Sequence, residues 1–420
     1  MSIGYRLYTA LLYLLLPYVL THLIWRGRKQ PAYLQHWWER FGRYTARPLR
    51  PVIWLHAVSV GETRAAAPLI KALQARYPDY QIVFTHMTPT GRETGEQLFG
   101  AQVMRCYLPY DYPFAVRRFL DHFRPRFGLL LETEIWPNLI EACHRRSIPL
   151  ALVNARLSGR SARRYAKFGY LSRSSLQKLT LVAAQTSDDA RRLTELGAGE
   201  VNIMGNLKFD MTPPDQAVSD GAALRATFGA GRRVLLAAST REGEESLLLD
   251  SLSQLDMNDL LLVIVPRHPQ RFDEVAALLE QRGISYRRRS QGENLSSGIQ
   301  VLLGDSMGEL FTYYAACDVA IIGGSLLPFG GQNLIEACAM GKPVVLGPHT
   351  YNFAEASSHA LAAGAAVQIK DTDELLTATL ALLSNPPRRQ AMGEAGLVFS
   401  QQHRGATSQL MTLLEKHIHN

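Results

Sequence analysis

The sequence has little cysteine and none of the spacings that cysteine-based sites require. The four cysteines among 420 residues lie far apart and form neither a CxxC pair nor a Cys/His metal pattern: Cys106, Cys143, Cys317 and Cys338. We therefore expect reduced, buried thiols in a cytoplasmic protein. The chain also lacks an HExxH motif, a Walker loop and a nucleophile elbow, which argues against zinc proteases, P-loop enzymes and serine hydrolases.

Acidic residues are almost absent from the first 50 positions. This stretch holds eight Lys and Arg against one acid, Glu39, and so carries +7 of the chain's formal net charge of +8. The other 370 residues are nearly neutral in sum. A basic excess beside an apolar segment predicts anionic lipid headgroups as the partner rather than nucleic acid.

Residues 7–25, LYTALLYLLLPYVLTHLIW, are almost entirely apolar and are followed by Arg26, Arg28 and Lys29. This pattern predicts a retained membrane anchor within residues 1–30, with the domains that follow on the cytoplasmic side. Pro17, His22 and the marginal length leave open whether the helix spans or half-inserts. A buried core helix is the alternative. Residues 33–44 predict an interfacial helix.

Beyond the anchor, short apolar runs alternate with amphipathic stretches, and this alternation predicts an α/β fold. The periodicity breaks near Pro213 and Pro214 and then restarts. We therefore expect two doubly wound parallel-sheet domains that face a cleft, covering residues 31–210 and 211–420, and we allow for the last helix packing back on the first domain. Ligands in such sheets bind beyond the carboxyl ends of the strands.

In the first half, Glu62 follows the first expected strand, in HAVSVGETRAA, and is the candidate catalytic base. A carboxylate at a helix start is also a common stabilising charge. His56 is a possible second base, although a histidine at a strand end is more often a satisfied side chain. Glu132 and Glu134 follow three leucines and would share one face if extended, and Asn154 follows another strand.

In the second half, the turn containing Gly323 and Gly324 leads through Gly330 and Gly331 towards a helix containing Glu336. Such a turn predicts backbone N–H groups facing an anion, with Glu336 one turn inside the helix and in reach of a ribose diol. Three further polar candidates follow strands: Ser239, Arg267 and His268.

Asp371, Thr372 and Asp373 match the DxD metal motif of one class of sugar transferases. The triplet directly precedes a helical stretch, which favours helix capping. We therefore assign no metal site.

Seven motifs in order behind the apolar segment resemble the 3-deoxy-D-manno-octulosonic acid (Kdo) transferases of lipopolysaccharide assembly: HAVSVGE, LETEIWPN, NARLSGRS, GNLKFD, STREGEE, PRHPQR and GGSLLPFGGQNLIEACAMGKPVVLGP. The match covers nearly the whole chain. The resemblance implies a GT-B glycosyltransferase at the cytoplasmic face of the inner membrane. It would transfer Kdo from CMP-Kdo to a lipid A precursor, lipid IVA, with inversion and without a metal or other cofactor.

The resemblance also implies roles for individual residues. Glu62 would be the base, and Glu132, Glu134, Asn154 and Arg156 would bind the acceptor or Kdo. The CMP site would comprise Ser239, Thr240, Arg267, His268, Gly323, Gly324, Asn333 and Glu336.

Two rival functions stay open at this point. The nearer is another membrane-surface GT-B enzyme, such as the UDP-N-acetylglucosamine transferase of peptidoglycan synthesis. The other is a non-catalytic membrane scaffold that kept the fold. The sequence also leaves open the number of Kdo residues added, the preferred acyl pattern and the oligomeric state.

Overall fold

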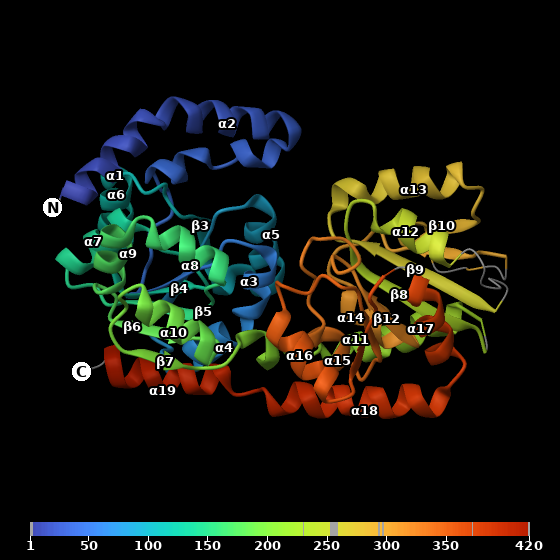
Figure 1. Cartoon of the computed structure of the whole chain (residues 1–420). Coiled ribbons are helices and arrows are strands. Elements are labelled where there is room, and N and C mark those ends of the chain that lie inside the picture. The colour runs from blue at the N-terminus through green and yellow to red at the C-terminus, as the bar shows by residue number, and fades with distance from the viewer. Residues whose placement is uncertain are drawn as a thin grey trace. The chain divides into compact units, whose positions relative to one another are not determined.

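The computed structural model describes residues 3–229, 231–252, 259–292, 295, 298–371 and 373–418 (Figure 1). The chain forms two compact units, Met1–Met211 together with Arg404–Asn420, and Thr212–His403. Each unit contains one seven-stranded sheet, and every strand pairing found in the described residues is parallel. The predicted pair of doubly wound α/β domains is therefore confirmed.

The first sheet has the strand order β3-β2-β1-β4-β5-β6-β7. Because the order reverses between β1 and β4, the carboxyl ends of these two strands flank the switch point at which such sheets bind ligands. The strands are β1 (Val52–His56), β2 (Gln81–His86), β3 (Met104–Tyr107), β4 (Pro125–Leu131), β5 (Leu150–Ala155), β6 (Leu181–Ala184) and β7 (Val201–Ile203).

Helices cover both faces of this sheet, which explains why its strands are nearly continuous apolar runs. One face packs against α3 (Val60–Ala65), α4 (Ala67–Arg76) and the C-terminal α19 (Ala406–Ile418), which runs beside α4 in Figure 1. The other face packs against α6 (Pro113–Phe123), α7 (Pro137–Arg145), α9 (Gly169–Leu176) and α10 (Ser187–Glu195). The unit is completed by α5 (Pro89–Phe99), α8 (Gly159–Ala166), η3 (Gly100–Gln102) and η4 (Leu207–Asp210).

The N-terminal apolar segment forms α1 (Ile3–Leu14) and α2 (Leu16–Lys29). No single helix in the described residues is long and apolar enough to cross a bilayer, but Gly4–Leu14 and Leu16–Arg28, bent by 48°, pass the length and composition test as a pair. The inner face of α1 is bonded to the first unit: the Tyr8 hydroxyl donates to Asp111 (3.0 Å) and that of Thr9 to Asn138 (3.0 Å).

The interfacial helix expected over residues 33–44 is not continuous. The segment instead forms two 3₁₀ turns, η1 (Pro31–Leu34) and η2 (Trp37–Phe41). The physical reason is that Glu39 and Arg40 point into the unit. Glu39 pairs with Arg92 (2.6 Å) and accepts the N–H of Tyr107 (2.8 Å), and Arg40 lies over the Tyr107 ring (4.0 Å).

The second sheet has the order β10-β11-β9-β8-β12-β13-β14, with its switch point between β8 and β12. Its strands are β8 (Arg233–Thr240), β9 (Leu260–Pro266), β10 (Tyr286–Arg288), β11 (Val301–Leu303), β12 (Val319–Ile322), β13 (Val344–Leu346) and β14 (Ala366–Gln368). One apolar core joins this sheet to α12 (Glu244–Ser251), α13 (Phe272–Gln281), α17 (Asp373–Leu383) and α18 (Pro386–Gln402). The remaining elements are α11 (Asp215–Thr227), α14 (Leu310–Ala316), α15 (Ile335–Ala339), α16 (Ala354–Ala362), η5 (Pro269–Arg271) and η6 (Arg289–Gln291).

Candidate active site

Glu62 lies at the start of α3, directly after the carboxyl end of β1. Its Oε1 accepts the Ser59 hydroxyl (2.8 Å), its Oε2 accepts the N–H of Val58 (2.7 Å), and its own N–H donates to the Ser59 hydroxyl (3.3 Å). Glu62 therefore does perform the helix-start role that the sequence offered as the alternative.

The surroundings of Glu62 also favour its protonated form. Burial and, after it, the charges of Glu132 and Glu134 together raise the pKa of Glu62 to about 7, against the lowering effect of the Val58 and Ser59 hydrogen bonds. A carboxylate whose pKa lies near the working pH is suited to accept a proton in catalysis. The helix-start role and the role of a base are therefore compatible in one side chain.

Glu132 and Glu134 do not lie on an extended strand as expected. Glu132 has left-handed backbone geometry (φ 59°) just after β4 ends, so the two acids do not share a strand face. Both still lie close enough to Glu62 to raise its pKa. Glu134 accepts the indole N–H of Trp136 (2.7 Å) and lies 3.8 Å from Nε2 of His56.

Lys208, in η4, is a charged residue of this site that sequence reasoning did not single out. Its ammonium lies 3.1 Å from Oε1 of Glu132. The signal was available, since Lys208 is a lone cation between two apolar residues, Leu207 and Phe209, that become buried. The broken periodicity around it suggested only a domain boundary.

Asn154 positions the segment that carries Lys208. It is fully buried with left-handed backbone geometry (φ 51°), and its Oδ1 accepts the N–H of Leu207 (3.0 Å) while its carbonyl accepts the side-chain amide of Gln185 (3.0 Å). Its Nδ2 has no hydrogen-bond partner in the part of the chain that the structure describes. A direct contact of Asn154 with substrate stays a prediction.

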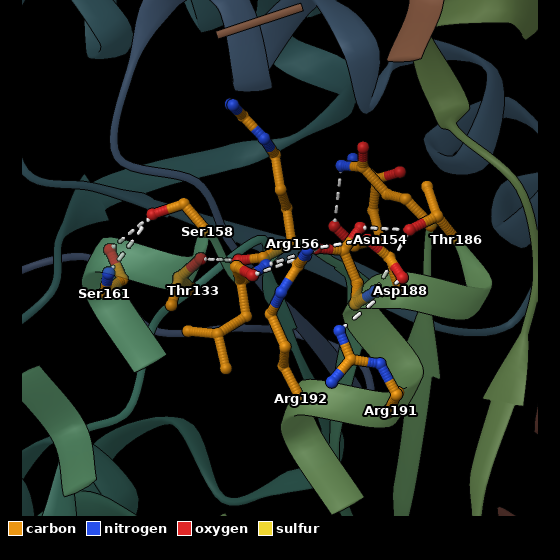
Figure 2. A network of polar contacts seen from close by, with 12 residues as sticks. Thr133, Asn154, Arg156, Ser158, Ser161, Thr186, Asp188, Arg191 and Arg192 are labelled. Carbon is orange, nitrogen blue, oxygen red and sulfur yellow. Dashed lines mark hydrogen bonds and ion pairs between the residues drawn. The ribbon is translucent and has the colours of Figure 1, made fainter. Parts of the chain in front are cut away.

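Figure 2 shows how the turn after β5 is fixed from the side of α10. Arg192 pairs with Asp188 (2.7 Å) and donates to the carbonyl of Leu157 (3.2 Å), and the hydroxyl of Thr133 donates to the carbonyl of Arg156. The Arg156 side chain extends away from this network in the figure. Its predicted role with the acceptor or Kdo stays a prediction.

In the second unit, Gly323 and Gly324 do not present free N–H groups to an anion as expected. Glu244, which is fully buried, accepts the N–H groups of Gly324 (2.6 Å), Leu326 (2.9 Å) and Leu327 (3.3 Å). The Glu244 carboxylate therefore takes the place at these N–H groups that the sequence analysis expected a bound anion to take. Gly323 is needed for another reason, since a Cβ there would lie 2.4 Å from the Ser239 carbonyl oxygen.

The expected helix beyond the second glycine pair is only the five-residue α15, in which Glu336 is the second residue and not one turn inside. Asn333 accepts the N–H of Ile335 (3.2 Å) and donates to Oε1 of Glu336 (3.1 Å). These contacts bring Asn333 and Glu336 together as one polar pair. A helix this short adds little dipole to an anion site.

Two arginines, Arg241 and Arg267, directly follow the carboxyl ends of β8 and β9 in the second sheet. The N–H of Arg267 donates to the Thr240 carbonyl (2.9 Å), which joins the ends of the two strands. Burial lowers the pKa of His268, and the neighbouring charges of Arg241 and Arg267 lower it further. His268 is therefore neutral at pH 7, and the positive charge comes from the two arginines. Arg241 was not singled out from the sequence.

Two other candidate groups, Thr240 and Asp371, have structural partners. The Thr240 hydroxyl donates to Glu245 (2.6 Å), which also forms a buried pair with Arg271 (2.6 Å). Asp371 accepts the N–H groups of Asp373 (3.1 Å) and Glu374 (3.0 Å), so its predicted capping role is confirmed. Thr372 lies outside the described residues. In the described ranges, no three His, Cys, Asp or Glu side chains cluster so that they could hold a metal ion.

Comparison with known proteins agrees with this geometry. Residues 35–211 match the family model described as 3-Deoxy-D-manno-octulosonic-acid transferase (kdotransferase), and residues 245–398 match that of glycosyl transferases group 1. The chain is 47% identical over 390 residues to the 3-deoxy-D-manno-octulosonic acid transferase of Bordetella pertussis, covering 90% of both chains. It is 39% identical to that of Haemophilus influenzae, covering 98% of both.

The chain belongs to the Kdo transferase family. Among solved structures, the Anabaena protein HepE in complex with UDP is similar, with a TM-score of 0.61 at 14% identity over 87% of this chain and 99% of that one. This likeness supports the two-domain fold alone. The Kdo transferase is thus a glycosyltransferase built on GT-B-like parallel-sheet domains.

Proposed function

We propose that this Kdo transferase moves Kdo from CMP-Kdo to a lipid A precursor, lipid IVA, at the cytoplasmic face of the inner membrane. Transfer occurs by direct displacement with inversion and requires no metal or other cofactor. The observation that carries the proposal is Glu62, a partly buried carboxylate with a pKa near 7 at the switch point of the first sheet.

Glu62 removes the proton from the acceptor hydroxyl as that oxygen attacks Kdo. Val58 and Ser59 fix the carboxylate but use one lone pair on each oxygen, so a further lone pair remains for the hydroxyl proton. Glu132 and Glu134 make Glu62 more basic by opposing its ionised form. Lys208 limits this effect by pairing with Glu132.

The second unit binds the leaving nucleotide. Cytidine monophosphate carries a single phosphate, and Arg267 and Arg241 supply positive charge for it without a divalent ion. His268, being neutral, serves as a hydrogen-bonding group. Asn333 and Glu336 form the polar pair proposed for the ribose diol.

The N-terminal helices hold the enzyme at the bilayer. Their outer surface exposes large apolar side chains beside Arg26 and Arg28, a combination suited to anionic lipid. These side chains are Leu7, Leu11, Leu14, Leu15, Tyr18, Ile24 and Trp25. An enzyme held at the bilayer meets its acylated acceptor at a raised local concentration.

The direct test is to incubate the full chain with CMP-Kdo and a purified lipid A precursor and to analyse the lipid by mass spectrometry. The proposal expects a mass increase of one or more Kdo units and release of CMP. In parallel, CMP should raise the melting temperature and UDP should not. An unchanged lipid, or stabilisation by UDP alone, would reject the proposed reaction.

A further inference from the structure

A second strongly basic segment lies far from the N-terminus. Between Glu141 and Asp188 the chain has nine Lys and Arg and no acid. The interpretation that the basic excess is confined to the first 50 residues is therefore wrong, because the rest of the chain is neutral only in sum. Three of the nine charges have carboxylate partners: Arg145 and Lys178 pair with Glu141 (both 2.7 Å), and Arg146 pairs with Asp121 (2.9 Å).

Four other cations in this segment form what we call the α8 strip, which comprises Arg160, Arg163, Arg164 and Lys167. All four are exposed, and none of their side chains forms a hydrogen bond or ion pair in the described parts of the chain. They lie on and just after α8, a helix without a buried residue. Their three- and four-residue spacings place like charges side by side, which destabilises a helix. The strip therefore does not serve the stability of α8.

One part of α8 faces the carboxylate site. The Tyr165 hydroxyl lies 3.5 Å from the carbonyl oxygen of Thr133, and Glu134 contributes, after burial, to raising the pKa of Tyr165. Ser158, which caps α8, and Ser161 lie near Thr133 and Arg156 in Figure 2. Because Tyr165 lies between Arg164 and Lys167 in the sequence, the strip runs beside Thr133 and Glu134.

The other end of α8 leads to the apolar surface of α1. Phe168 and Tyr170, which follow the strip, are 65% and 64% exposed. The Tyr170 ring lies against Gly4 of α1, where an added Cβ would be 3.2 Å from Cδ1. Within the first unit, the row of cations therefore lies beside the carboxylate loop and leads to the apolar helices.

We propose that the α8 strip binds the phosphate groups of the acceptor. The inference rests on the proposed function, since it takes the acceptor to be a phosphorylated and acylated sugar. Such a molecule carries a sugar hydroxyl, anionic phosphate and acyl chains, and the first unit offers carboxylates, cations and apolar surface beside one another for these three groups. Guanidinium groups bind phosphate through paired N–H donors. The contact of Tyr165 near Glu134 favours the acceptor over bulk headgroups of the bilayer.

The test uses the triple variant Arg160→Gln, Arg163→Gln and Arg164→Gln. Transfer from CMP-Kdo is measured in nonionic detergent micelles without other anionic lipid, on a bisphosphorylated tetraacyl disaccharide and on its enzymatically dephosphorylated form. We expect KM for the phosphorylated acceptor to rise roughly tenfold to hundredfold, as for lost charge-assisted hydrogen bonds. The value of kcat should change little, and the difference in KM should shrink on the dephosphorylated acceptor. Melting temperature should not fall, because the variant relieves repulsion.

A matched control removes three cations of the same unit that lie outside the strip. In the variant Arg117→Gln, Arg145→Gln and Arg146→Gln the net charge changes equally, and KM for the phosphorylated acceptor should stay within about threefold of the native value. Equal effects of the two triple variants would show that only net charge matters and would overturn the inference.

Two further measurements separate the strip from the proposed function. Direct titration of the phosphorylated lipid in micelles should show weaker binding by the strip variant whether or not transfer occurs, so an inactive native chain would reject the function and leave the strip testable. The second measurement is sedimentation with phosphatidylglycerol vesicles. A strip variant with native KM and native lipid affinity in micelles, but with lost vesicle binding, would assign the strip to the bilayer and overturn our inference.

Discussion

The two units each contain a seven-stranded parallel sheet, with different strand orders, and they also differ in how they use their carboxylates. In the first unit, Glu62, Glu132 and Glu134 gather at the switch point, and burial and mutual repulsion keep the pKa of Glu62 high. In the second, Glu244 is saturated by backbone N–H groups and Glu245 by Arg271.

This difference determines the chemistry that each sheet edge can perform. Acids left partly unsatisfied in the first unit can accept a proton. In the second unit, where Glu244 and Glu245 are saturated by their own chain, the charges near His268 come from Arg241, Arg267 and Arg271 and from Glu242, which pairs with Arg241 (2.9 Å). In the proposed reaction, the first unit therefore supplies the base and the second unit supplies the arginines that bind the nucleotide phosphate.

Replacing Glu62 by Gln removes the proposed base of the first unit and should have the largest effect on turnover. Gln keeps the contacts to Val58 and Ser59 but cannot accept a proton, so kcat should fall by roughly 10² to 10⁴. CMP affinity, measured by calorimetry, should not change. A variant with near-native turnover would reduce Glu62 to a helix-start residue and pass the role of base to Glu132 or His56.

Replacing Glu244 by Ala removes the carboxylate that accepts the N–H groups of the glycine turn in the second unit. The N–H groups of Gly324, Leu326 and Leu327, two buried and one partly buried, would lose their acceptor. Each loss costs about 1 kcal/mol or more, so the free energy of unfolding should fall by about 3 kcal/mol. Chemical denaturation measures the change, with the surface substitution Glu394→Ala as control. A stability close to that of the control would mean that the turn does not depend on Glu244.

Replacing Arg267 or Glu336 by Ala sharpens the assignment of the nucleotide to the second unit. Each loss of a hydrogen bond to a charged group should weaken CMP binding by about tenfold to a hundredfold. Calorimetry on both variants tests this expectation. Native affinity in both would place the nucleotide elsewhere.

The smallest effect is expected at His268. Because its pKa is lowered, it is neutral from pH 7 upward, and His268→Gln should change CMP affinity at pH 7 by about threefold or less. Binding of CMP should also be insensitive to pH between 7 and 8. A marked loss of affinity over that range would show that the charged imidazole binds the phosphate.

Sequence patterns predicted the strands and the polar residues that follow them, because hydrophobic periodicity and apolar runs are local properties of the chain. They did not predict the partners of those residues. The saturation of Glu244 depends on a turn about 80 residues away in the chain, and Lys208 meets Glu132 across 76 positions. Residues 7–25 read as uniformly apolar, yet Tyr8 and Thr9 bond to Asp111 and Asn138, more than 100 positions further on.

The most direct test of the account is the pH dependence of kcat/KM for Kdo transfer. Glu62 must be ionised to act, so the rate should fall about tenfold per pH unit below an apparent pKa near 7 and level off above it. In Lys208→Met the unpaired charge of Glu132 should move this midpoint upward. The residual activity of Glu62→Gln should lack the transition. A midpoint near 4.5, the ordinary value of a glutamate, or a native profile retained in Glu62→Gln, would contradict the account.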